Sequence, residues 1–258
     1  MPLSWAERRK LSYKLILAFV FLGVAAYFSY PYFSKPSTCF DGKRNQDEAG
    51  TDCGGSCAAV CVDEIKPPVT IWSGVFPSAN GRYSAVAFVE NRNADAGTRA
   101  ARYNFRIYDE SNIIIAERKG ETFIAPGESF TLIEPNIDAG RRIPRRAFFE
   151  FLSFSEWETI DPPERPLIFI RDQKLSNDDS HTRLDARLES AMIIPVSDIA
   201  VAALLYDEKG NAITVSSTIV PTLAGQSSRP IVFTWPKMEL SNIARAEIIP
   251  RFNVFENI

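Results

Sequence analysis

The first strong pattern along the chain is an uncharged apolar run from Leu15 to Phe28, which follows three basic residues at positions 8–10. A helix that crosses a bilayer needs about 20 predominantly apolar residues. The run reaches that length if it extends from Leu11 to Tyr30 and if Lys14 reaches back to the membrane surface. The pattern therefore predicts a transmembrane helix over residues 11–33.

The charges around this segment predict its orientation. Basic flanks stay on the cytoplasmic side, so we expect residues 1–10 in the cytoplasm and the chain after Pro31 outside it. The alternative is a cleaved signal peptide, because Val24–Ala26 offers small residues of the kind found at cleavage sites. Apolar and aromatic residues continue past Ala26, which favours a retained anchor.

Beyond Lys66 the pattern changes to an alternation of apolar and polar residues, which is typical of half-buried strands. Each half of this body reads as six or seven short strands in about 90 residues, as in an immunoglobulin-like sandwich. No long amphipathic helix alternates with the strands, so an α/β enzyme fold is not expected. The predicted strands are Tyr83–Glu90, Arg102–Tyr108, Ile113–Ile115, Phe130–Ile133, Arg146–Phe154, Ile231–Trp235 and Ala244–Phe255.

The two halves of the body repeat each other at a constant offset. Tyr108–Glu110 recurs 98 residues later as Tyr206–Glu208, and Arg146-Ala147 recurs 99 residues later as Arg245-Ala246. A proline-rich connector, Asp161–Pro166, lies between them. This junction and the one at Lys66-Pro67-Pro68 favour a rod over a globule. The predicted fold class is all-β: two tandem immunoglobulin-like β-sandwiches, residues 66–158 and 164–258, after one transmembrane helix and a small disulfide-rich module at residues 39–61.

All four cysteines lie in that module, at positions Cys39, Cys53, Cys57 and Cys61. Four cysteines in a short exported segment predict two disulfides, which supply the stability that so small a core cannot. Three pairings are compatible with the sequence. Zinc bound by four thiolates is the competing interpretation, but the exported location and the absence of a Cys-x-x-Cys spacing disfavour it.

The loop between the first two cysteines carries four oxygen-bearing side chains: Asp41, Asn45, Glu48 and Asp52. Carboxylate and amide oxygens spaced along a glycine-containing loop are suitable ligands for calcium. The spacing differs from that of an EF-hand. Asp, Asn and Gly also form turns without any ion, so a solvated loop is the alternative.

The cysteine module resembles a short motif of many bacterial surface and secreted proteins. The matching residues are Cys39, Asp41-Gly42, Asn45, Glu48, Asp52-Cys53-Gly54-Gly55, Cys57 and Cys61. The resemblance covers about a tenth of the chain. It implies a bacterial surface protein, because the motif usually accompanies adhesive or envelope-associated domains and not catalytic ones.

A second resemblance lies in the first repeat. Phe105–Asp109 looks like the signature of FxLYD-type domains, with Ile in place of Leu, and Ala203–Asp207 keeps Leu-Tyr-Asp but loses the Phe. The family consists of small exported prokaryotic β-sandwich modules without defined catalytic residues. In both copies we expect the Tyr to pack at the sheet edge and the Asp to cap a turn.

Charge and chemistry exclude other classes. The first fourteen residues carry a net charge of +3 and the remainder −6, so no basic stripe for nucleic acid is present. The only histidine is His181, in a loop beside Ser180, and no hydrolase or phosphate-binding motif occurs. Arg141, Arg142, Arg145 and Arg146 form a basic cluster that suits anionic lipid or an acidic partner, or is simply solvated.

The sequence therefore predicts a non-catalytic, single-pass membrane protein of the cell envelope. It would act on the outer side of the membrane as a binding, adhesion or scaffold module. We expect protein partners, no nucleic acid, and no cofactor except calcium. The alternative is a subunit of an export or pilus-like envelope machine that docks through its helix and its sheet edges.

Overall fold

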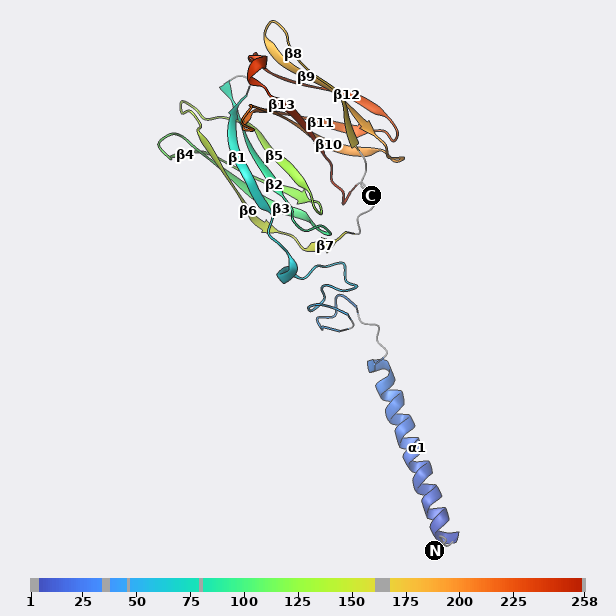
Figure 1. Cartoon of the computed structure of the whole chain (residues 1–258). Coiled ribbons are helices and arrows are strands. Elements are labelled where there is room, and N and C mark those ends of the chain that lie inside the picture. The colour runs from blue at the N-terminus through green and yellow to red at the C-terminus, as the bar shows by residue number, and fades with distance from the viewer. Residues whose placement is uncertain (1–4, 34–37, 46, 79–80, 161–167, 257–258) are drawn as a thin grey trace. The chain divides into compact units, whose positions relative to one another are not determined.

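The computed structural model describes residues 5–33, 38–45, 47–78, 81–160 and 168–256. The chain divides into two compact units, Met1–Cys57 and Ala58–Ile258, which we describe separately. The first unit contains helix α1, Trp5–Phe33, and most of the cysteine module (Figure 1). The second unit contains the β-strands and the short 3-10 helices Val62–Glu64 and Leu240–Asn242.

Helix α1 contains a 22-residue stretch, Arg9–Tyr30, that is long and apolar enough to cross a membrane. Its large apolar side chains are exposed on every side, as at Leu17, Phe19 and Phe21. A helix that is apolar all round suits lipid rather than the surface of a soluble domain. The predicted apolar helix is thus confirmed, while its orientation and its retention stay predictions.

The first half of the β-unit forms two antiparallel sheets. One has the order β1-β2-β5 and the other the order β4-β3-β6, with β7 paired to the start of β3. The bounds are β1 Val69–Pro77, β2 Tyr83–Glu90, β3 Ala96–Tyr108, β4 Ile114–Ile124, β5 Ser129–Ile137, β6 Arg146–Phe154 and β7 Trp157–Thr159.

The second half repeats this strand order, with sheets β12-β9-β8 and β11-β10-β13. The predicted all-β fold with two sandwiches is therefore confirmed. Cross-strand pairs also match, because Tyr108 lies opposite Arg146 and Tyr206 lies opposite Arg245. The bounds are β8 Ile168–Asn177, β9 His181–Ser190, β10 Val196–Tyr206, β11 Ala212–Leu223, β12 Ser228–Pro236 and β13 Arg245–Arg251.

Each sandwich has its own core, built from alternating positions as the sequence pattern predicts. In the first sandwich Tyr103, Phe105 and Ile107 of β3 point inward and meet Phe130 and Trp157. The second core is assembled in the same way from β9, β10 and β12. Both cores contain aliphatic and aromatic side chains, which lets each sandwich bury its apolar faces.

A third apolar cluster joins the two sandwiches. Ala202, Leu204 and Tyr206 of β10 pack with Val86 of β2 and with Val215. Partly buried side chains surround this contact: Trp72, Phe76, Ile133, Ala212 and Ile249. The outer face of sheet β11-β10-β13 therefore lies against the outer face of sheet β1-β2-β5, next to each other in Figure 1.

Strand β10 explains why this contact forms. Its residues Val201–Tyr206 are all apolar, so the strand lacks the alternation of a sheet with one wet face. Val201, Ala203 and Leu205 fill the core of their own sandwich, while the residues between them face the other sandwich. The two sandwiches of the second unit therefore pack on each other and are not held apart. Burial of a second apolar face stabilises this contact, and the connector Asp161–Pro166 lies outside the described residues.

Arg251 of β13 adds a polar contact between the sandwiches. Its side chain is 10% exposed, and its Nε donates to Glu128 Oε1 at 2.8 Å. Its Nη1 donates to Thr122 Oγ1 at 2.7 Å, and its Nη2 donates to the carbonyl oxygen of Phe123. The guanidinium also lies 3.8 Å from the centre of the Phe123 ring and 4.0 Å from that of Phe130.

Candidate functional site

The aspartates of the two repeats close equivalent hairpins. Asp109 Oδ1 accepts hydrogen bonds from the backbone N–H groups of Ser111 and Ile113, both at 2.9 Å. Asp207 Oδ1 accepts from Lys209 at 2.9 Å and from Asn211 at 2.8 Å. The predicted role of these residues as turn caps is confirmed.

These contacts lower the pKa of both carboxyl groups. For Asp109 the main cause is the backbone N–H of Ile113, and an ion pair with Arg142 adds to it. For Asp207 the main cause is the side-chain amide of Asn211, followed by its backbone N–H. Both aspartates are therefore ionised at neutral pH and serve the fold.

The tyrosines before these aspartates have different surroundings. Tyr206 is buried in the contact between the sandwiches, with the guanidinium of Arg245 4.1 Å above its ring. Burial and the nearby Glu247 raise the pKa of Tyr206 to about 12. Tyr108 of the first sandwich is half-buried and faces a pocket.

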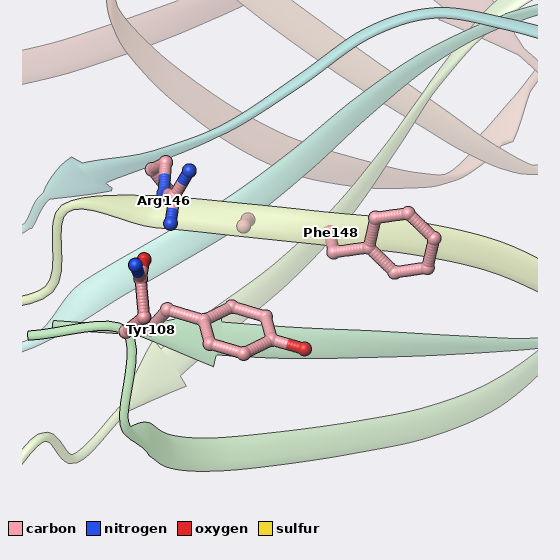
Figure 2. Close-up of a pocket in the computed structure, with 5 residues that line it drawn as sticks. Tyr108, Arg146 and Phe148 are labelled. Carbon is pink, nitrogen blue, oxygen red and sulfur yellow. The ribbon is translucent and has the colours of Figure 1, made fainter.

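This pocket has a volume of about 290 Å³ and is lined by Tyr108, Asn112, Arg146, Ala147 and Phe148. Figure 2 shows Tyr108 on β3 beside Arg146 and Phe148 on the neighbouring strand β6. Within the described ranges no carboxylate pairs with Arg146. An exposed cation next to two aromatic rings suits a carboxylate or another anionic group.

Strand β6 continues this surface. Phe148 is 48% exposed and Leu152 is 52% exposed, although both lie in a strand. β6 pairs with β3 on one side, and Ser73 Oγ donates to the Ala147 carbonyl oxygen at 2.8 Å. We name Tyr108, Arg146, Phe148 and Leu152 the β6 surface. The sequence pattern of residues 146–154 could have indicated it, because Phe148 and Leu152 are apolar at outward positions of the strand.

The four arginines of the predicted basic cluster have separate roles. Arg142 pairs with the carboxylate of Asp109. The backbone N–H of Arg145 donates to the Tyr108 carbonyl oxygen at 2.8 Å, and Arg146 lines the pocket. Arg141 is exposed. Contact with anionic lipid stays a prediction.

The cysteine module is fully oxidised. Cys39 and Cys57 form one disulfide. Cys53 and Cys61 are disulfide-bonded as well, so no free cysteine remains among the described residues. The predicted two disulfides are confirmed, and they leave no thiolate in the module for the competing zinc site.

The structure brings the four candidate calcium ligands into one loop. Asp52 accepts from the backbone N–H groups of Asp41 at 2.9 Å and Gly42 at 2.8 Å. Asp41 in turn accepts from the side-chain amide of Asn45 at 2.9 Å. Glu48 is buried and accepts from the Asn45 backbone at 3.0 Å. These bonds account for a closed loop without an ion.

One atom of this loop remains unpaired. Asn45 Oδ1 is buried and has no hydrogen-bond partner among the residues that the structure describes. An amide oxygen in that state suits a cation or a water molecule. Calcium binding by Asp41, Asn45, Glu48 and Asp52 stays a prediction.

His181 begins strand β9 and is exposed. Its Nδ1 lies 2.7 Å from Ser180 Oγ and 3.6 Å from Asp178 Oδ1. A catalytic triad needs the serine and the carboxylate on opposite ring nitrogens. Here both lie beside the same nitrogen, and Asp178 Oδ1 accepts from the backbone N–H groups of Ser180 and His181. These contacts also lower the pKa of Asp178.

The geometry defines an all-β protein with an apolar N-terminal helix, a disulfide-bonded module and two packed sandwiches. No family model matches the chain, and no curated protein matches it. The resemblances to the bacterial cysteine motif and to FxLYD-type domains therefore stay predictions.

Proposed function

We propose that this protein is a non-catalytic, membrane-anchored binding protein of the bacterial cell envelope. In this proposal helix α1 is the anchor, the disulfide module and the sandwiches lie outside the cytoplasm, and a partner protein docks on the β6 surface. The observation that carries the proposal is the exposed Phe148 and Leu152 beside Arg146, which pairs with no carboxylate among the described residues.

Two features support the anchor and the exported location. Helix α1 is apolar on all sides over Arg9–Tyr30. Disulfides persist in oxidising compartments, and all four cysteines are disulfide-bonded. The basic residues before the apolar run favour a cytoplasmic N-terminus.

The chemistry of the β6 surface supports a protein partner. Aromatic and arginine side chains are enriched where proteins bind one another, and neighbouring exposed apolar side chains mark interaction sites. Arg106 lies over the Phe148 ring at 5.2 Å and pairs with Glu150, which fixes the ring position. Arg146 has no carboxylate partner among the described residues, so the partner protein should present an acidic group there.

The internal repeat and the FxLYD resemblance support the same proposal. Small exported sandwiches commonly serve as binding or scaffold modules, and here the second copy has its equivalent tyrosine covered. The first copy keeps Tyr108 facing an open pocket. The first sandwich is then the binding module and the second sandwich supports it.

Site-specific cross-linking tests the proposal. The photo-reactive residue p-benzoylphenylalanine replaces Phe148 in the full chain, expressed in its own membrane, and Ile219 is replaced as the matched exposed control. We expect a discrete cross-linked protein at position 148 and none at 219, and Arg146→Glu should abolish it. Equal cross-linking at both positions would contradict docking on the β6 surface. A stoichiometric set of cross-linked envelope proteins would favour the machine subunit.

Calcium is part of this proposal as a ligand of the cysteine module. Its support is the unpaired Asn45 Oδ1 beside the carboxylates of Asp41 and Asp52. Titration calorimetry of the full chain with calcium chloride tests it. We expect heat of binding that is absent in Asp52→Asn, whereas equal heat in both proteins would contradict the assignment.

A further inference from the structure

A pocket of about 450 Å³ lies where the two sandwiches meet. Ser84 of β2 and Ile133 of β5 contribute from the first sandwich. Strands β11 and β12 and the start of β9 contribute from the second. Ligand sites occur preferentially at such junctions, and the volume lies within the usual range for small molecules.

The lining of this pocket is neutral. No Asp, Glu, Lys or Arg belongs to it, and His181 is its only ionisable side chain among the described residues. The side-chain hydroxyls of Ser84, Ser216, Ser217 and Thr234 make no hydrogen bond within the part of the chain that the structure describes. Such a lining disfavours a charged ligand, because a charge buried without a partner is costly.

Trp235 adds a second observation. Its side chain is 4% exposed and lines the pocket, and its ring stacks with Phe233 at 6.4 Å between centroids. Its Nε1–H is buried and has no acceptor among the described residues. Buried donors are nearly always paired in folded proteins, so this one calls for an acceptor from outside the chain.

Proline rings complete the wall. Pro77 and Pro236 line the pocket together with Ile133 and Val215. The pocket thus combines unpaired hydroxyls, an unpaired indole donor and flat apolar surfaces, without charge. Sugars combine the same properties, because a pyranose ring has hydroxyls at its edge and C–H groups on its faces.

We propose that this pocket binds a neutral carbohydrate. Trp235 Nε1 would donate to a sugar oxygen, and the hydroxyls of Ser216, Ser217 and Thr234 would exchange hydrogen bonds with sugar hydroxyls. The inference does not depend on the β6 surface or on the anchor. Both sandwiches must be present, because each supplies part of the wall.

The test is an NMR titration of the full chain in a detergent without a sugar head group, which would otherwise compete. Glucose, galactose, mannose, N-acetylglucosamine, maltose and lactose are the probes. We expect at least one of them to shift the indole N–H resonance of Trp235, with a Kd of about 10 mM or tighter. The resonance is assigned by its loss in Trp235→Phe.

Variants make the result specific. Backbone amide resonances of the lining residues Val215 and Thr234 report binding in every variant, because Trp235→Phe removes the indole reporter. Trp235→Phe keeps an aromatic ring and removes the donor, so affinity should fall by about fivefold or more, and Ser216→Ala with Ser217→Ala should act likewise. Trp157→Phe in the other core is the matched control and should bind as the wild type. Arg146→Glu should also bind as the wild type, which separates this proposal from partner docking.

Three outcomes would overturn the proposal. The first is that no neutral sugar shifts the Trp235 resonance. The second is that Trp235→Phe binds sugar as well as the wild type does. The third is that proline-rich peptides shift the resonance while sugars do not, which would make the pocket a peptide site. Sugar affinity should also be insensitive to salt, because the lining carries no fixed charge.

Discussion

At the scale of single residues, Arg251 makes an unusually large number of contacts for one arginine. It has a carboxylate, a hydroxyl, a backbone carbonyl and two aromatic rings around one guanidinium. A planar group with several donors in a fork suits such a setting, whereas a lysine would satisfy fewer partners. Its partners belong to the first sandwich, so its contacts exist only while the two sandwiches are packed together.

Arg251→Met should lower the free energy of unfolding by about 3 kcal/mol, because Glu128 would be left poorly solvated and without its cation. Chemical denaturation of the full chain measures the change. The matched control is Arg102→Met, whose partner Glu121 is exposed, and it should cost no more than about 0.5 kcal/mol. Similar losses of unfolding free energy in the two variants would show that the Arg251 contacts contribute no more stability than an exposed ion pair.

At the scale of elements, the hairpins β3–β4 and β10–β11 have the same design. An aspartate at the end of one strand accepts the N–H groups of the following turn. Positive φ angles at Asn112 and Gly210 complete these turns. The Tyr-Asp pair therefore has a structural reason to recur at an offset of 98 residues.

Asp207→Ala should lower the melting temperature by several degrees, because two backbone donors lose their acceptor. The pKa of Asp207 is lowered in the folded protein from its ordinary value of 3.8, mainly by the side-chain amide of Asn211. Its contribution is therefore complete above that value and is lost as the pH falls through the folded pKa. The variant should show a shallower loss of stability below about pH 4.

Thermal melts monitored by circular dichroism at pH 7 and at pH 3 measure both effects. Glu208→Ala is the control, because Glu208 is exposed in the same turn. The control should melt as the wild type does. If the melting temperature falls equally between pH 7 and pH 3 in the wild type and in Asp207→Ala, ionisation of Asp207 does not contribute to the pH dependence of stability.

The cysteine module is a second element with a testable mechanism. Its loop is closed by the Cys39–Cys57 disulfide and by the hydrogen bonds that Asp52 accepts from the backbone of Asp41 and Gly42. Reduction should open the loop and allow trypsin to cleave after Lys43 and Arg44, because local opening exposes the backbone to proteases. The sandwich cores contain no cysteine, so their strands should stay resistant.

Limited proteolysis with and without a phosphine reductant, read by mass spectrometry, measures this outcome. Cys39→Ser combined with Cys57→Ser should be cleaved at the same bonds without reductant. Unchanged resistance of the reduced module would mean that hydrogen bonds alone hold the loop. Early loss of the sandwiches would mean that they depend on the disulfides.

At the scale of the whole molecule, retention or cleavage of helix α1 decides whether the protein stays in the membrane or is released from it. If helix α1 spans the membrane and is retained, carbonate washing of membranes should leave the full-length chain in the pellet. Replacing Phe19 and Leu22 by arginine should release it, because charge at the centre of a span is costly. Release of a shortened wild-type chain would instead indicate cleavage near Val24–Ala26.

Much of the architecture could be predicted from sequence patterns. Alternation located β2, β3 and β6, and the apolar run located α1. The contact between the sandwiches was not predicted, although residues Val201–Tyr206 carry the signal of a strand buried on both faces. The pocket of Trp235 could not be predicted, because its walls come from strands that are distant in sequence. No local sequence pattern indicates that these strands lie close together in the fold.

The double burial of β10 also bears on how such a chain can change during evolution. Each substitution at Ala202, Leu204 or Tyr206 must be tolerated by Val86 and its neighbours in the other sandwich. Recombination that exchanged one sandwich would pair two contacting faces whose side chains had not been selected to fit each other. The two halves share one strand order, but their contact constrains them to change together rather than as interchangeable modules.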